Sequence, residues 1–494
     1  MKTFSYLHDA WSPPAQANIS LALLQGRADG FEPATGNLPK RRIEACKHLS
    51  NLGDALPKWM LDGTSSLTRL IQGAINAAAH AAGSQPLVKV GDPHWRQSYA
   101  GAFHRLTGLE GANSAKMAKA ATDYLYQHLY LPDGTPLAQA QALPTDVTIE
   151  RTGGAKAPSE CPVPRLRLPI SHSIMNKRAQ AALSILSLHP KWWNLAGFEV
   201  VVLGGAAQLA PTIPLVRAGA TVHAIVRGHS KRRQMLVEAC KDAPGTLILP
   251  SANICDVVAT PRELAAYIAA IAKPVIVVDS LYAPSRKHLH LALAADLVEK
   301  LIFQARPHTT LMLSGTPTDV YRFEDSLVDA IVPLQGPNYL AAKRIGRWRA
   351  SLLHSEGAKT ITPILPLAAT ESVMNSPRLI STVVGAPAVG IYPADPVTAS
   401  QLAASWLLFE VNSPQSTAPW QGSKAPCGLW GNPDSPLNSL LPNANMRMHA
   451  ALVAGRLGAG RERWVGQVPE SVFAEGAGRL RALVQKAKSR LGRY

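Results

Sequence analysis

The sequence predicts an α/β protein with a doubly wound parallel sheet near the middle of the chain. From residue 198 to residue 313, short apolar runs rich in β-branched residues alternate with stretches of helical periodicity. The runs are apolar throughout, which is typical of strands covered by helices on both faces. Of the 494 residues, 47% are hydrophobic and only 17% are charged, which excludes a disordered chain.

The elements of this sheet are expected in a strict strand-helix order. The predicted strands are 198–203, 221–226, 246–249, 275–278 and 309–313, and the predicted helices between them are 209–218, 230–241, 261–272 and 287–303. In such sheets a ligand binds beyond the carboxyl ends of the strands, near the point where the strand order reverses. Candidate site residues are therefore sought in the loops that follow the strands.

Four regions are expected along the chain. Residues 1–145 are predicted to be mainly helical, 146–195 to be a Pro-rich connector, 196–395 to form the sheet domain, and 396–494 to be a basic helical extension. The extension contains an amphipathic pattern with Arg479 and Lys486 between regularly spaced leucines. A polar and aromatic cluster from Asp92 to His104 is expected either to line a substrate cleft or to form a buried joint between two regions.

The composition indicates which classes of molecule the protein binds and where it is located. The net charge of +17 favours anionic partners such as phosphorylated cofactors, but no nucleic-acid-binding motif is present. No stretch is apolar and long enough for a membrane span, and no secretory signal is evident. Five cysteines without a CxxC pair favour a reducing compartment, and the cytoplasm is the expected location. No metal site is expected, and histidines such as His288 are expected at the surface or at helix caps.

The turn after the first strand is the first candidate site. It contains the small residues Gly204, Gly205 and Ala206, followed by Gln208 and Leu209. Small side chains let backbone N–H groups approach a pyrophosphate, and the following helix adds a partial positive charge. The turn does not match G-x-G-x-x-G. It is interpreted as a phosphate-binding turn, with a purely structural turn as the alternative.

The ends of the next strands indicate which nucleotide this site prefers. Arg227 follows the second strand, where an acid would bind ribose hydroxyls, and a guanidinium suits a 2′-phosphate. NADP(H) is therefore favoured over NAD(H), and S-adenosylmethionine is disfavoured. Asp256 is expected to bind the adenine amino group or to cap a helix. Asp279 and Ser280 follow the fourth strand, where the nicotinamide ribose would lie.

The candidate catalytic residues follow the fifth strand. Tyr339 and Lys343 are four residues apart and so lie on one face of a predicted helix. A lysine cation beside a phenol stabilises the phenolate, and such a tyrosine can exchange a proton with a carbonyl or alcohol oxygen. Ser314, directly after the strand, can hold that oxygen. The alternative is an ordinary exposed pair on a helix.

Together these residues resemble the short-chain dehydrogenase/reductase superfamily over about residues 196–370. The resemblance is carried by the turn at Gly204, by Asp256, by Ser314 and by Tyr339-x-x-x-Lys343, and 361–368 resembles the sixth strand and the loop over the nicotinamide. The chain departs from the family in its incomplete glycine turn, in lacking Asn-Ala-Gly after the fourth strand, and in the 195 residues that precede the sheet.

The resemblance implies a Rossmann-like NAD(P)-binding domain in an NADP(H)-dependent oxidoreductase. It implies that Tyr339 is the acid/base, that Lys343 activates the phenol and binds ribose, and that Ser314 orients the substrate. The apolar segment 361–396 would border a small-molecule substrate, which suggests a bulky or hydrophobic compound. A non-catalytic Rossmann-fold nucleotide-binding protein and a Rossmann-like transferase are the alternatives. The sequence leaves the oligomeric state open, a homodimer included.

Overall fold

Seven strands form the central sheet in the order β11-β8-β7-β4-β5-β6-β3. They are β4 (Glu199–Leu203), β5 (Thr221–Ile225), β6 (Thr246–Pro250), β7 (Val275–Asp279), β8 (Thr310–Leu313), β11 (Thr360–Ile361) and β3 (Ile149–Gly153). All neighbours are parallel except β3, which pairs antiparallel with β6. The six parallel strands have the doubly wound order 3-2-1-4-5-6, with the switch point between β4 and β7. The predicted α/β fold class is confirmed.

The computed structural model describes only part of the chain. The described residues are 60–61, 66–154, 177–193, 195–228, 231–283, 286–323, 326–376, 378–389, 391, 393–412, 448–452 and 456. They all belong to one compact unit of the chain. The first 59 residues and the predicted amphipathic helix around Arg479 lie outside the described residues.

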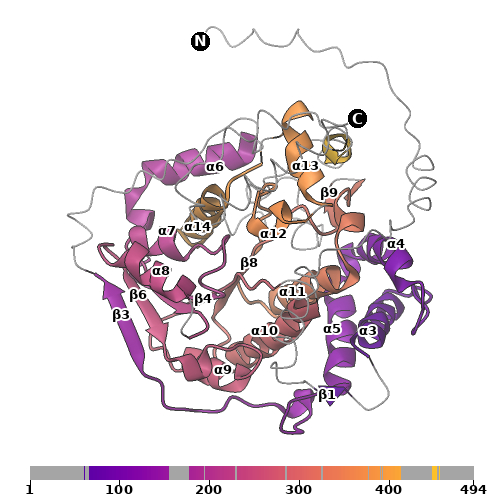
Figure 1. Cartoon of the computed structure of the whole chain (residues 1–494). Helices are drawn as coiled ribbons and strands as arrows, with labels where there is room; N and C mark the ends of the chain where they lie inside the picture. Colours follow the sequence, from indigo (N-terminus) through magenta and orange to yellow (C-terminus); the bar gives the residue numbers. More distant parts are fainter. Residues whose placement is uncertain are drawn as a thin grey trace, which may run out of the picture. The chain divides into compact units, whose positions relative to one another are not determined.

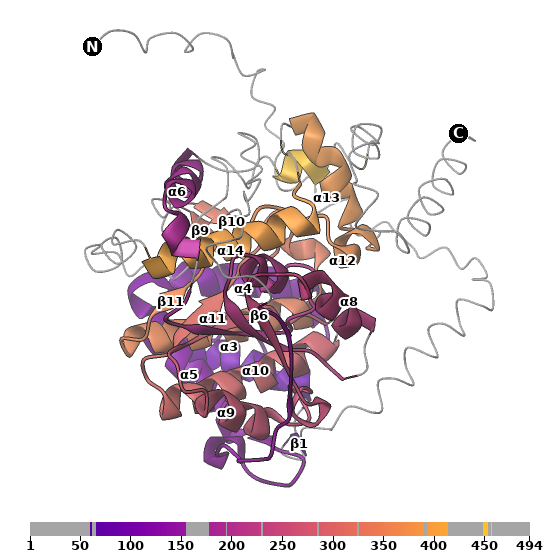
Figure 2. The same ribbon diagram turned by 90° about the vertical axis from the view of Figure 1, so that its left-hand side faces the viewer.

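Helices cover both faces of the sheet, as the alternation predicts (Figures 1 and 2). One face packs against α6 (Lys177–Leu188), α7 (Thr212–Arg217), α8 (Lys231–Cys240) and α14 (Pro396–Asn412). The other packs against α9 (Pro261–Ala269), α10 (Arg286–Ala305) and α11 (Pro337–Ser355). In β4, Val200 and Val202 point to the first layer while Val201 and Leu203 point to the second, because side chains alternate along a strand.

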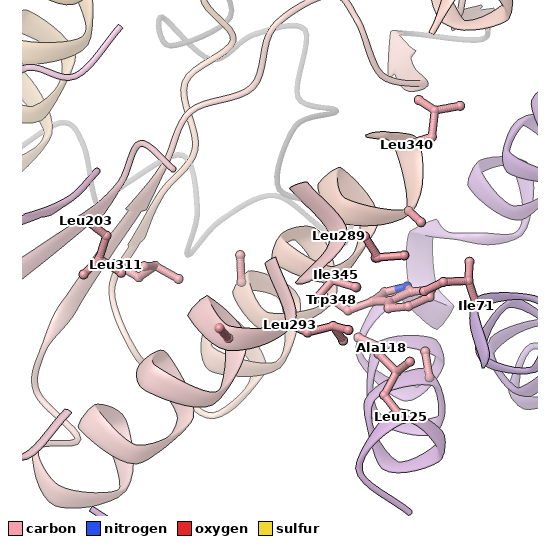
Figure 3. Close-up of a cluster of buried hydrophobic side chains, with 14 of the residues drawn as sticks. Ile71, Ala118, Leu125, Leu203, Leu289, Leu293, Leu311, Leu340, Ile345 and Trp348 are labelled. Carbon is pink, nitrogen blue, oxygen red and sulfur yellow. The ribbon is translucent and has the colours of Figure 1, made fainter. Parts of the chain in front are cut away.

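The N-terminal helices share a core with the second layer. They are α3 (Leu67–Ala81), α4 (Trp95–Leu109) and α5 (Ser114–Gln127), and α4 and α5 contact α11. Figure 3 shows Trp348 of α11 between this helical layer, represented by Ile71 and Leu125, and α10. Leu203 and Leu311 of the sheet belong to the same buried cluster. The described helical region is thus a further layer on the sheet domain.

Two local predictions are wrong. Residues 146–195 were expected to be a Pro-rich connector without a strand of the sheet, but 149–153 form the edge strand β3. Its side chains are mostly exposed, so it lacks the apolar run that marks the central strands. The helix expected at 209–218 begins only at Thr212 and has six residues. The residues from Gly204 to Pro211 form an extended series of turns instead.

Several short elements complete the described fold. They are β1 (Met60–Leu61), β2 (Leu129–Tyr130), β9 (Tyr321–Phe323), β10 (Ser326–Val328), α12 (Glu371–Met374) and α13 (Ile380–Gly385). The last two lie in the segment 361–396, which was expected beside the substrate. None of the helices in the described part of the chain has the length and apolar character needed to cross a bilayer.

Candidate functional site

The predicted site residues gather at one edge of the sheet. Gly204, Arg227, Asp279 and Ser314 each follow the last residue of a parallel strand or lie at its end, and the carboxyl ends of parallel strands share one edge. Tyr339 lies in the first turn of α11, beside the loop that follows β8. The topology therefore brings together groups that are up to 135 residues apart in the sequence, from Gly204 to Tyr339.

Both glycines of the turn after β4 are required by packing. Gly204 has φ +71°, and a Cβ there would lie 3.0 Å from the carbonyl oxygen of Ser280 in the loop after β7. A Cβ on Gly205 would lie 2.7 Å from the Cβ of Ala224 in β5. The glycine pair thus lets the turn lie tightly against both neighbouring strands of β4. This packing by itself accounts for the absence of side chains at these two positions.

The same turn offers backbone donors. The N–H groups of Gly205 and Ala207 are bonded to carbonyl groups of the protein. Among the described residues, the N–H groups of Ala206, Gln208 and Leu209 have no hydrogen-bond partner. All three residues are partly exposed, so that a ligand oxygen can reach the turn. These donors belong to the turn itself, because α7 begins later and is short.

The side chains of this turn contact the segment after β11. The Oε1 atom of Gln208 accepts a hydrogen bond of 2.8 Å from the N–H of Glu371. Leu209 packs against a small cluster of alanines formed by Ala368, Ala394 and Ala399. Both side chains therefore support the turn from the side of the segment 361–396, and only their backbone donors remain open to a ligand.

Arg227 is paired with Asp256 at the end of β5. Their Nη2 and Oδ2 atoms are 2.9 Å apart, and the Arg227 side chain is 60% exposed. The other oxygen of Asp256 accepts hydrogen bonds from the N–H groups of Val258 and Ala259, as in a capping turn. Asp256 was expected to bind adenine or to cap the following helix, but α9 begins after Thr260, so these hydrogen bonds stabilise a turn before the helix, and the adenine contact stays a prediction. An exposed ion pair contributes little free energy, so an incoming phosphate can compete for Arg227.

Tyr339 points toward the carboxyl edge of the sheet. Its hydroxyl lies 3.0 Å from Oγ1 of Thr318, which in turn lies 2.7 Å from Oγ1 of Thr316. The Nζ of Lys343 lies 5.6 Å from the centre of the Tyr339 ring. Thr318 in the β8–β9 loop thus contacts the phenol, whereas the predicted Ser314 is partly exposed at the end of β8. Ser314 was expected to hold the substrate oxygen, and that role stays a prediction.

Asp279 at the end of β7 places a carboxyl group near Lys343. Burial raises the pKa of Asp279 to about 6, while a hydrogen bond from the N–H of Leu281 and the charge of Lys343 lower it. Behind it on α10, Glu299 is 1% exposed, and its Oε1 has no hydrogen-bond partner among the described residues. Burial and the nearby charges of Asp279 and Asp296 raise the pKa of Glu299 well above its ordinary value, which favours the neutral acid.

His288 is a site residue that sequence reasoning missed. It was expected at the surface or at a helix cap; it lies in the first turn of α10 and is only 5% exposed. Its ring stacks on the Tyr339 ring, with 5.2 Å between the ring centres. The centre of the Tyr282 ring lies 5.4 Å from the centre of the His288 ring. The only sequence signal is its position at the start of the helix after the fourth strand, at the same sheet edge as Asp279.

The stability of the protein is expected to depend on pH through His288. Burial and the charge of Lys343 lower the pKa of His288 from 6.5 to about 3. Between these values the unfolded chain binds a proton that the folded state does not, so stability falls as the pH falls. Relative to His288→Phe, the wild type should lose about 1.4 kcal/mol of unfolding free energy per pH unit from about pH 6 to about pH 4, measured by urea unfolding.

The matched control for this titration is His94→Phe, because His94 is exposed. Its unfolding free energy should follow the wild type across the same pH range. Carboxyl groups titrate alike in all three proteins and therefore cancel in the differences. Parallel curves for the wild type and His288→Phe would show that the folded protein tolerates a charged His288.

A buried ionic network anchors α11 behind Tyr339 and Lys343. Arg344 is fully buried and donates to Glu110 and, over 2.7 Å, to the hydroxyl of Thr107. Arg347 bonds Glu110 at 2.9 Å and Asp319 at 3.2 Å. Two arginines thus face two acids, one at the end of α4 and the other next to Thr318. The network joins the N-terminal helices, α11 and the loop that contacts the phenol.

The cluster from Asp92 to His104 forms a joint with this part of the site. The Tyr99 hydroxyl donates to the carbonyl oxygen of Gln335 at 2.5 Å, just before α11. The Nδ1 atom of His104 lies 2.7 Å from Oδ2 of Asp329. Of the cluster, Trp95 and Tyr99 lie in a buried joint, as one of the two expected roles requires, whereas His94, Arg96 and His104 are exposed.

Comparisons with known proteins add little beyond the fold. In the described part of the chain, no group of three or more histidines, cysteines and acids could hold a metal ion. No protein-family model matches the sequence, and no curated protein matches it. One solved structure that matches is the short-chain dehydrogenase/reductase from Serratia marcescens BCRC 10948, with a TM-score of 0.32 and 16% identity over 44% of this chain and 91% of that chain. A similarity this low assigns no activity.

Proposed function

We propose that this protein is an NADP(H)-dependent oxidoreductase that acts on a carbonyl or alcohol group of a small molecule. One observation carries the proposal: at the switch point of a doubly wound sheet, a turn with open backbone donors lies at the same sheet edge as a tyrosine and a lysine on one helical face. The first part is suited to a dinucleotide and the second to proton transfer.

The residues around the turn fit the phosphates of such a cofactor. The open N–H groups of Ala206, Gln208 and Leu209 are donors for a pyrophosphate. Arg227, mostly exposed at the end of β5, would hold a ribose 2′-phosphate, and Asp279 and Lys343 would face the nicotinamide ribose. When bound, the cofactor supplies the hydride, and the protein supplies orientation and proton transfer.

Tyr339 is the proposed proton donor to the substrate oxygen. Its hydroxyl is held by Thr318. The nearby Lys343 cation stabilises the phenolate that remains after the proton has left. Thr316 and Thr318 form a short chain of hydroxyl groups beside the phenol, and Ser314 is the residue proposed to orient the substrate. The segment 361–396 contacts the glycine turn through the hydrogen bond from the N–H of Glu371 to Gln208, and its apolar composition is the basis for proposing a bulky or hydrophobic substrate.

Titration calorimetry with NADPH and NADH tests the cofactor assignment. We expect the wild type to bind NADPH more tightly, and Arg227→Ala to weaken NADPH about 10- to 100-fold, because a charge-assisted hydrogen bond contributes about 1.5–3 kcal/mol. NADH affinity should stay the same. Arg217→Ala is the matched control, because Arg217 is an exposed arginine at the far end of α7, just before β5.

The same titration separates the alternatives. Preferential binding of S-adenosylmethionine or a nucleotide sugar would replace the reductase with a Rossmann-like transferase. Binding of NADPH without oxidation by any aldehyde or ketone would favour a non-catalytic nucleotide-binding protein. No binding of NADPH at all would overturn the proposal.

A further inference from the structure

The imidazole of His288 carries a donor that the described protein does not use. Its Nδ1 lies 3.4 Å from the backbone N of Ala283 and accepts that N–H. The ring hydrogen therefore resides on Nε2, on the opposite side of the ring. Nε2 is buried, and it has no hydrogen-bond partner among the described residues.

This arrangement is costly for a residue whose only role is packing. A buried donor without an acceptor destabilises the folded state, and phenylalanine would fill the same aromatic stack without that loss. The imidazole also stays neutral over the physiological range, since burial and Lys343 lower its pKa to about 3. A neutral N–H donor of this kind can polarise an oxygen without giving up its proton.

The position of this donor limits the ligand. The His288 ring is stacked on the Tyr339 ring at 5.2 Å with an angle of 27° between the planes, so that the two side chains are within reach of one small molecule. The charge of Lys343 acts on both His288 and Asp279. The ring of Tyr282, which is 45% exposed, has its centre 5.4 Å from the centre of the His288 ring.

We propose that the Nε2–H group of His288 binds an oxygen of the substrate beside Tyr339, and that the substrate is a planar, conjugated or aromatic carbonyl compound that packs on Tyr282. In this arrangement Tyr339 transfers the proton and His288 only donates a hydrogen bond, so its own protonation state does not change. The inference rests on the proposed function for the choice of a carbonyl oxygen.

The first test compares the stability of two variants. In His288→Phe the aromatic stack is kept and the donor is removed, and in His288→Gln an N–H donor is kept at a similar reach. Thermal unfolding at about pH 8, where the imidazole is neutral in both states, should give His288→Phe a Tm equal to or above that of the wild type. A Tm lowered by several degrees in His288→Phe, and restored in His288→Gln, would show that protein or an ordered water holds the N–H in the resting state, which would overturn the proposal.

The second test uses 4-(dimethylamino)cinnamaldehyde, a planar conjugated aldehyde whose absorption moves to longer wavelength when its oxygen accepts a hydrogen bond. We expect a shift with the wild type, a smaller shift with His288→Phe and partial recovery with His288→Gln. Equal shifts in all three proteins, or no binding of the probe, would overturn the proposal.

The two tests distinguish this inference from the proposed function. The probe requires no cofactor, and NADPH affinity should be unchanged in His288→Phe. If the absorption shift of the probe depends on His288 but the protein does not bind NADPH, the protein has a carbonyl-binding site and the reductase proposal is wrong. If the protein binds NADPH tightly but the absorption shift does not depend on His288, only the proposed role of His288 is wrong.

Discussion

Replacing Glu110 by alanine should destabilise the protein by about 3–5 kcal/mol, because it leaves two arginines buried with one acid between them. Arg344 is fully buried and Arg347 nearly so, and Glu110 bonds both. Neither guanidinium can lose its charge by deprotonation at neutral pH, so the cost cannot be avoided by titration. Urea unfolding at neutral pH measures the loss.

Glu238→Ala is the matched control, because Glu238 is 70% exposed and pairs with Lys241 one turn away. Its unfolding free energy should stay within about 0.5 kcal/mol of the wild type. A small effect of Glu110→Ala would mean that water or another acid replaces the lost carboxylate, and that the network does not anchor α11.

Replacing Tyr339 by phenylalanine should lower the turnover of a carbonyl substrate by about 10²–10⁴-fold, the range attributed to a positioned acid or base. The change keeps the stack on His288 and removes only the hydroxyl that contacts Thr318. NADPH affinity should be unaffected, because the proposed phosphate ligands lie elsewhere. The measurement is the rate of NADPH oxidation with the aldehyde or ketone that the wild type reduces fastest.

Tyr124→Phe on α5 is the control for this change, since Tyr124 lies in the N-terminal helical layer and its ring contacts His128. It should leave turnover unchanged. Equal turnover in Tyr339→Phe and the wild type would exclude Tyr339 as the proton donor and would direct attention to the neighbouring threonines.

The strands that are buried on both faces could be predicted from the sequence. β4, β5, β6, β7 and β8 lie within a residue or two of their expected bounds, because strands covered on both faces must be apolar along their whole length. The edge strand β3 escaped prediction because one side is solvated and its pairing with β6 supplies the hydrogen bonds. The short helix α7 also departed from expectation, since Gly204 and Gly205 pack the turn against two neighbouring strands first.

The candidate site was predictable only in part, for a similar reason. Residues that follow strands could be listed from the sequence, and Tyr339 and Lys343 share a helical face by their spacing alone. The neighbours of that pair could not be foreseen. His288 reaches Tyr339 from α10 and Thr318 reaches it from the loop after β8, and their burial depends on packing between segments far apart in the chain.

The amino-acid sequence by itself therefore determined the class of sheet, the order of strands and helices along the chain, and the sheet edge where a ligand would bind. These features follow from apolar runs and helical periodicity, which are local properties of the chain. Tertiary structure alone decided that the N-terminal helices join the same core, that Thr318 rather than Ser314 contacts the phenol, and that His288 is buried beside it. Those outcomes depend on which surfaces come into contact when the layers pack, and the residue pattern of a single segment does not indicate its tertiary contacts.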